Sequence, residues 1–195
     1  MHQLRRARHR LGPRGRGAAA VETALVLPVI LLIFFGILEF GMLFKDWFAT
    51  ISATRAGARL ASAEPRNATF ARDAADQVQN AATALNLTNV QALWVYKADV
   101  NGYPVGGGGA AFTGCTVCVK YTWDAGANAF TQVSNTWAGT AQNACAGDPL
   151  HDTVGIYLQL KHDSFTKMVF NNFVLKEHAV LSLEPLPATT FGGCK

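Results

Sequence analysis

The chain has 195 residues, half of them hydrophobic, and a formal net charge of +4. Six arginines lie within the first 17 residues, and the 11 basic residues after Gly17 are outnumbered by 13 acidic ones. A domain that binds nucleic acid would carry its basic residues on the folded part, so this charge distribution argues against a nucleic-acid partner.

An apolar run directly follows the arginines and extends from Val21 to Phe44. A bilayer core of about 30 Å needs about 20 helical residues, which this run supplies. A buried core helix fits such a run less well, and a cleavable secretory signal would be shorter. We therefore predict one transmembrane helix that also contains Pro28, Gly36 and Glu39.

The arginines set the orientation of this helix. Basic residues beside an apolar run keep their flank in the cytoplasm. We interpret residues 1–17 as a basic cytoplasmic leader and predict a single-pass protein of the cell membrane. Everything beyond the span would then be extracytoplasmic.

The helix is expected to continue past the membrane as far as residue 63. Residues 45–63 are rich in alanine and lack proline, whereas Pro65 should end the helix, because the residue before a proline avoids helical conformations. Residues 18–63 would form a transmembrane and projecting rod of roughly 70 Å. Pro28 should kink it.

An amphipathic pattern marks the part of this helix beyond the membrane. Ile51 lies four residues after Trp47 and three after Phe48, and Arg55 and Arg59 follow at further steps of four.

Residues 64–195 are expected to form an extracytoplasmic α+β domain. A second helix is predicted over residues 68–85, with Asn67 as its N-cap. Its apolar face comprises Phe70, Ala74, Val78, Ala81, Ala82 and Leu85. Segments rich in β-favouring residues follow at 90–98, 116–123, 129–133, 154–162 and 174–183. Alternation in the last two predicts antiparallel strands with one buried face, and residues 164–172 are expected to form a short helix or a crossover.

The four cysteines, Cys115, Cys118, Cys145 and Cys194, all fall in the predicted extracytoplasmic part. An even number in an oxidising compartment favours two structural disulfides, and the sequence does not choose among the three possible pairings. Cys115 and Cys118 could instead form a redox pair or half of a zinc site. However, β-favouring residues rather than a helix follow them, and no second close cysteine pair completes a zinc site.

No catalytic constellation stands out in the sequence. The glycines at 106–109 are not followed by the Gly-Lys-Ser/Thr that a phosphate-binding loop needs. His151, His162 and His178 are scattered, without metal-ligand spacing. We therefore expect no enzymatic activity, no cofactor and no metal.

The N-terminal residues resemble the signature of the TadE-like family. The resemblance rests on Arg16-Gly17-Ala18-Ala19-Ala20-Val21-Glu22, on Pro28, and on Phe35-Gly36-Ile37-Leu38-Glu39-Phe40-Gly41. Family members are pseudopilins of tight-adherence (Tad, Flp-type) pili, related to type IV pilins. The resemblance implies a pilin-like fold, with a long N-terminal helix followed by a helix and a small antiparallel β-sheet head.

The resemblance also implies a processing site and an assembly residue. A prepilin peptidase would cut after Gly17 and free the amine of Ala18, which leaves Glu22 as the fifth residue of the mature chain. In pilins this glutamate pairs with the terminal amine of a neighbouring subunit. Such pairing agrees with the high cost of an unpaired carboxylate in an apolar helix bundle.

The implied role is that of a minor pilin or pseudopilin of a Tad (type IVc) pilus, acting in pilus assembly and adhesion. Its partners would be other pilin subunits, the Tad assembly machinery, the prepilin peptidase and the membrane. Subunits would pack through Ala20, Ala24, Ala53 and Gly57, whose small side chains permit close approach.

Two other readings of the sequence stay open. In the first, the chain is a single-pass surface protein or adhesin that never polymerises. In the second, it is a membrane-tethered thiol redox protein that uses Cys115 and Cys118.

Overall fold

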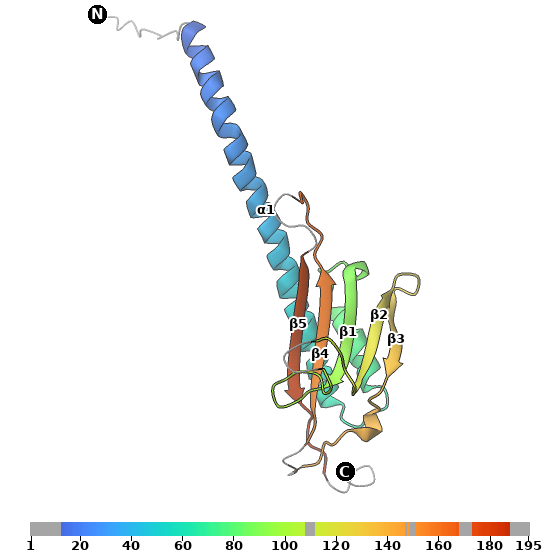
Figure 1. Cartoon of the computed structure of the whole chain (residues 1–195). Coiled ribbons are helices and arrows are strands. Elements are labelled where there is room, and N and C mark those ends of the chain that lie inside the picture. The colour runs from blue at the N-terminus through green and yellow to red at the C-terminus, as the bar shows by residue number, and fades with distance from the viewer. Residues whose placement is uncertain (1–12, 108–111, 147, 149–150, 168–172, 188–195) are drawn as a thin grey trace, which may run out of the picture. The chain divides into compact units, whose positions relative to one another are not determined.

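The computed structural model describes residues 13–107, 112–146, 148, 151–167 and 173–187 (Figure 1). The chain divides into two compact units, Met1–Gly41 and Met42–Lys195. We describe each by itself and call the second the head. The predicted α+β class is confirmed, because a long N-terminal apolar helix is followed by a second helix and a five-stranded antiparallel sheet.

Helix α1 extends from Pro13 to Ala63. It begins inside the segment interpreted as the leader, and proline suits the first helical position because its missing N–H would have no helical partner there. Pro28 lies inside α1, and the helix continues through it. The end at Ala63 agrees with the sequence prediction.

Helix α2, Phe70–Ala81, is shorter than predicted. Asn67 does not cap it directly, because its Oδ1 accepts hydrogen bonds from the N–H and the hydroxyl of Thr69 instead. The predicted apolar face is confirmed: Phe70, Ala74, Val78, Ala82 and Leu85 are buried, and Ala81 is half-buried.

The five strands form one sheet in the order β3-β2-β1-β4-β5, and every neighbouring pair is antiparallel. The strands are β1 (Val90–Lys97), β2 (Cys118–Asp124), β3 (Ala129–Asn135), β4 (Thr153–Lys161) and β5 (Val174–Ser182). Each agrees with a predicted segment to within two residues at either end. In the segment predicted as a short helix or crossover, residues 164–167 are not helical and residues 168–172 lie outside the described part of the chain.

The core lies between one face of the sheet and two helices, α2 and the part of α1 within the head (Figure 1). This part of α1 contributes a face of small and hydroxyl side chains to the core. They are Thr50, Ala53, Thr54, Gly57, Ala58 and Ala61. The aromatic residues of the predicted amphipathic pattern point elsewhere, since Trp47 and Phe48 are exposed.

Close helix packing explains this face of small side chains. A Cβ atom placed on Gly57 would lie 2.5 Å from Val78 Cγ2 and 3.2 Å from the carbonyl oxygen of Ala74, both in α2. Ala53 is completely buried in the same core. The prediction that Ala53 and Gly57 pack against other subunits is therefore wrong, because the head itself occupies that face.

The opposite face of the sheet is partly covered by the connection between β1 and β2. Phe112 from this connection stacks on Tyr157 of β4, with ring centroids 4.1 Å apart. Tyr96 of β1 packs edge-on to Phe112, and its hydroxyl donates a hydrogen bond to the carbonyl oxygen of Gly102. The connection ends in a disulfide between Cys115 and Cys118.

Candidate functional site

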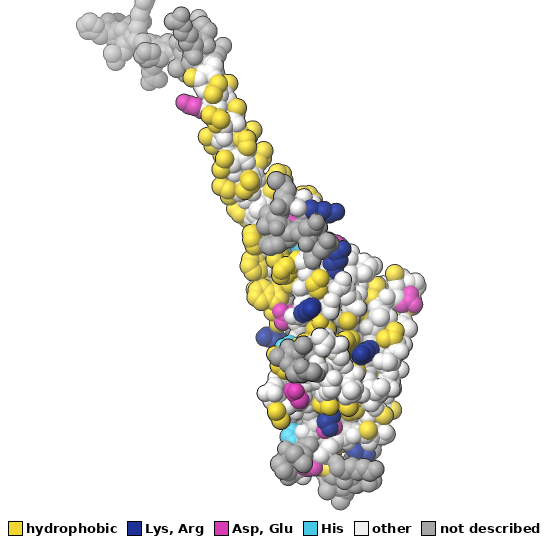
Figure 2. Space-filling view, in the orientation of Figure 1, with side chains coloured by type: hydrophobic (Ala, Val, Ile, Leu, Met, Phe, Trp, Pro, Cys, Tyr) yellow, Lys and Arg dark blue, Asp and Glu magenta, His cyan; other side chains and the backbone are white. Residues whose placement is uncertain are grey.

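The first unit presents an apolar helix surface that nothing in the described chain covers. Residues 17–34 are all exposed, and on the face drawn in Figure 2 the side chains of this segment are almost entirely hydrophobic. Within the described residues, Gly17–Ala63 is the one helix long and apolar enough to cross a membrane, and its most apolar stretch has a mean hydropathy of 2.6. An exposed apolar surface of this size marks a site of contact with a membrane or with other proteins.

Glu22 lies in the second turn after the predicted cleavage site and is exposed. It borders a shallow pocket of about 340 Å³ on the surface of α1, together with Thr23, Val26, Leu27 and Ile30. The hydroxyl of Thr23 donates to the carbonyl oxygen of Ala19 at 2.8 Å, so it is satisfied within the helix. Glu22 is thus the acidic group of an otherwise apolar pocket.

Gly17 and Ala18, the predicted cleavage residues, lie in α1 and are exposed. A Cβ atom on Gly17 would meet no other atom within 4 Å. The other predicted residues of the span, Val21, Pro28, Gly36 and Glu39, also lie in α1 within the first unit, whereas Phe44 belongs to the head.

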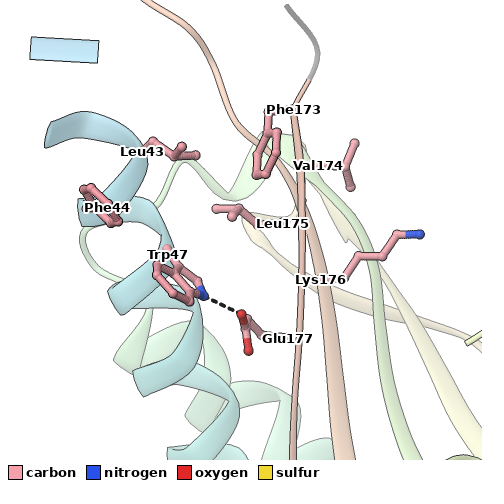
Figure 3. A pocket seen from close by; sticks show the side chains of 8 residues that line it. All are labelled: Leu43, Phe44, Trp47, Phe173, Val174, Leu175, Lys176 and Glu177. Atoms are coloured by element: carbon pink, nitrogen blue, oxygen red, sulfur yellow. Dashed lines mark hydrogen bonds between the residues drawn. The ribbon is translucent and has the colours of Figure 1, made fainter. Parts of the chain in front are cut away.

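A second pocket lies within the head, between α1 and β5 (Figure 3). Its volume is about 420 Å³. Leu43, Phe44 and Trp47 form the side that belongs to α1, and Phe173 and Leu175 face them from the other side, with Val174, Lys176 and Glu177 completing the lining. The indole N–H of Trp47 donates a hydrogen bond to a carboxylate oxygen of Glu177, which joins the two sides.

A contact between two side chains, His162 and Asp46, attaches α1 to the end of β4 nearby. Nδ1 of His162 lies 2.8 Å from Oδ2 of Asp46, and the His162 side chain is almost completely buried. A second pair lies elsewhere in the head, where Lys97 Nζ contacts the buried carboxylate of Asp152 at 2.6 Å. The same carboxylate accepts the backbone N–H of Asn143. Both carboxylates have structural partners.

The buried tyrosines of the sheet do not resemble acid–base groups. Burial raises the pKa of Tyr96 and of Tyr157 above the usual range. Burial likewise raises the pKa of Tyr121 to about 12. All three therefore stay protonated near neutral pH and act as packing residues.

The cysteines are oxidised where the structure describes them. Cys115 pairs with Cys118, one of the arrangements that the sequence leaves open, and Cys145 is disulfide-bonded as well. Cys194 lies outside the described residues. Strand β2 begins at Cys118, so no helix follows the close pair. Within the described segments, no group of three His, Cys, Asp or Glu side chains could hold a metal ion.

Sequence reasoning missed the pocket of the head. Trp47 and Glu177 are 130 residues apart, and the aromatic residues that follow the apolar run looked like part of a helix face. One signal was available. Phe44, Trp47 and Phe48 continue the apolar run into a part of α1 that already has a face of small residues for the core, so these aromatic side chains had to lie on another face.

The comparison with known proteins concerns the N-terminal part of the chain. A family model described as TadE-like protein matches residues 17–59. No curated protein and no solved structure matches the chain. The match begins at the predicted cleavage residue and contains the whole exposed apolar surface, Glu22 and the first turns of the head. The chain therefore carries a TadE-like segment over residues 17–59, which indicates a protein associated with Tad pili; the TadE-like family itself is one of pilus components rather than of enzymes.

Proposed function

We propose that this protein is a minor pilin or pseudopilin of a Tad (type IVc) pilus, anchored by one helix and acting in pilus assembly and adhesion. The observation that carries the proposal is the coincidence of the TadE-like match with an exposed apolar helix that bears a single acid near its start. A helix of this kind is stable only in lipid or among other apolar helices, and a pilin passes from one environment to the other.

The proposed orientation is that of a single-pass membrane protein. The arginines of residues 1–17 would remain in the cytoplasm, by the positive-inside rule. The head would lie outside, and its disulfides agree with this side of the membrane, because disulfides persist in oxidising compartments.

The proposed assembly step depends on Glu22. Cleavage between Gly17 and Ala18 would create a cationic amine, and the amine of one subunit would pair with Glu22 of the next. The apolar side chains around Glu22 support this step, because neighbouring apolar helices that cover them would exclude water and so strengthen a charge-assisted contact to the carboxylate. An unpaired carboxylate in the same surroundings would be costly.

Processing is tested by mass spectrometry of the mature N-terminus, in cells with and without the prepilin peptidase. The proposal expects a chain that begins at Ala18 in the first case and at Met1 in the second. An intact leader in the assembled form would overturn the processing claim. Cells that lack the protein are expected to lose piliation and surface adhesion together.

Pairing is tested with Glu22→Ala and a matched control, Thr23→Ala. The first variant should insert into the membrane normally but fail to assemble, because the carboxylate is gone. Thr23→Ala removes only a hydroxyl that bonds within its own helix, so it should assemble as the parent does. Normal piliation by Glu22→Ala would contradict the pairing.

A further inference from the structure

The exposed aromatic side chains of the head are gathered in two segments. Five described aromatic residues of the head are more than one-third exposed: Phe44 (46%), Trp47 (37%), Phe48 (61%), Phe165 (69%) and Phe173 (42%). The first three belong to the opening turns of α1 in the head, and the other two belong to the connection between β4 and β5. The other large apolar side chains of the head that are exposed among the described residues are aliphatic: Val100, Val133 and Leu181.

These two segments lie at the same end of the sheet. Lys161, the last residue of β4, pairs with Val174, the first residue of β5. Just beyond this pair, the N–H of His162 donates to the carbonyl oxygen of Phe173. The contact between the side chains of His162 and Asp46 brings α1 to this end.

The pocket between α1 and β5 joins the two segments, since Phe44 and Trp47 line one side and Phe173 the other (Figure 3). We call Phe44, Trp47, Phe48, Phe165 and Phe173 the aromatic collar.

The collar is continuous with the apolar run in the chain. Phe44 is the last residue of that run, and Trp47 and Phe48 follow within about 6 Å along the helix axis. Aromatic rings are enriched where a membrane protein passes from hydrocarbon to water. The rings of Phe44, Trp47 and Phe48 also lie against one another, with centroids 5.8–6.4 Å apart.

The polar groups around the collar suit the headgroup region. The indole N–H of Trp47 is satisfied by Glu177, which leaves its ring free to lie against lipid. Lys45, Lys161, Lys167 and Lys176 lie in the same segments or beside them. Long lysine side chains can extend from an apolar surface to lipid phosphates.

We propose that the aromatic collar lies in the headgroup region of the outer leaflet and that the pocket between α1 and β5 takes up part of a phospholipid acyl chain. The inference rests on the membrane anchoring in the proposed function. It adds that the head contacts the bilayer through Phe165 and Phe173, which lie between β4 and β5 in the chain, and not only through α1. This contact would fix which end of the sheet faces the lipid before the subunit enters a pilus.

The test uses the full chain in phosphatidylcholine vesicles whose acyl chains carry bromine, a short-range quencher of tryptophan fluorescence. Emission from Trp47 should be quenched, so Trp47→Phe should abolish the quenched component. The matched control is Trp94→Phe, at a half-buried tryptophan on the opposite face of the sheet, and it should leave the quenched component unchanged.

The contribution of the β4–β5 connection is tested by moving the fluorophore in the Trp47→Phe background. Phe165→Trp should restore a quenched component. Val100→Trp should not, because Val100 is even more exposed than Phe165 but follows β1 at the other end of the sheet.

Vesicle flotation in alkaline carbonate separates the failure of this inference from that of the proposed anchor. A chain that floats but shows the same quenching with and without Trp47 would overturn the inference and leave the anchor intact. A chain that does not float would overturn both. A Trp47 emission that resists bromine and varies with the protein-to-lipid ratio would assign the pocket to a second copy of the chain, which also overturns the lipid proposal.

Discussion

Replacing Gly57 with alanine tests whether the close packing of α1 against α2 is needed for the stability of the head. In an ordinary helix this change is favourable by about 1 kcal/mol, because glycine has a larger conformational entropy to lose. Here the new methyl group would lie 2.5 Å from Val78 Cγ2 and 3.2 Å from the carbonyl oxygen of Ala74. The geometry therefore predicts the opposite sign.

The magnitude follows from the size of the overlap. Carbon atoms pack at about 3.5–4.0 Å, so the Val78 methyl group would have to withdraw by about 1 Å. Valine in a helix has one strongly preferred rotamer, which makes a simple rotation costly. Overpacking of this kind costs about 1–3 kcal/mol. After the helical gain, we expect Gly57→Ala to lower the free energy of unfolding by up to about 2 kcal/mol.

The assay is thermal or denaturant unfolding of the full chain in detergent, followed by near-ultraviolet circular dichroism. Gly41→Ala is the matched control, since a Cβ there would meet no atom within 4 Å and should bring only the helical gain. In the double variant Gly57→Ala/Val78→Ala, the loss should be smaller than the sum of the two single losses. An increase in stability by Gly57→Ala equal to that of Gly41→Ala would refute the packing argument.

Three further predictions concern buried polar groups of the head. Tyr121→Phe should leave the free energy of unfolding unchanged or raise it by about 1 kcal/mol, because the Tyr121 hydroxyl has no hydrogen-bond partner among the described residues. Tyr96→Phe removes the hydrogen bond to Gly102 and should lower the free energy of unfolding by about 1 kcal/mol. Denaturant unfolding curves of the two variants test this difference. Burial raises the pKa of Tyr121 from 10.0 to about 12, so the folded state holds the phenolic proton more tightly than the unfolded state does. This contribution is complete below pH 10 and is lost as the pH rises towards 12, so alkaline unfolding should be less steep in Tyr121→Phe, and an identical pH profile would contradict the assignment. Asp152→Asn should lower the free energy of unfolding by about 1–3 kcal/mol, because it weakens the contacts to Lys97 and to the N–H of Asn143. The control is Asp124→Asn, at an exposed aspartate, and a loss no larger than that of the control would count against the prediction.

The sequence predicted most of the fold because the patterns concerned are local. Apolar and β-favouring residues alternate along β4 and β5, and α2 repeats its apolar residues at helical spacing, so both kinds of element were found within a few residues. The expectation of one buried face does not hold for β4, where Val154 to Leu158 are all buried, because Phe112 covers Tyr157 on the other face. The start of α1 was predicted too late, because residues 13–17 are polar and carry no periodic signal. The candidate residues at Gly17, Ala18 and Glu22 came from one contiguous motif, which the family match contains.

The sequence by itself determined the apolar helix, where it ends and the acidic residue near its start, since these depend on composition along one segment. Tertiary structure alone decided which face of α1 enters the core. Helical spacing shows which residues share a face, but only the position of α2 and the sheet explains why the small residues around Gly57 are buried and the aromatic ones are not. It also decided the pairing of Cys115 with Cys118 and the pocket that joins Trp47 to Glu177. These contacts depend on how the chain folds back on itself, and no local sequence pattern specifies that.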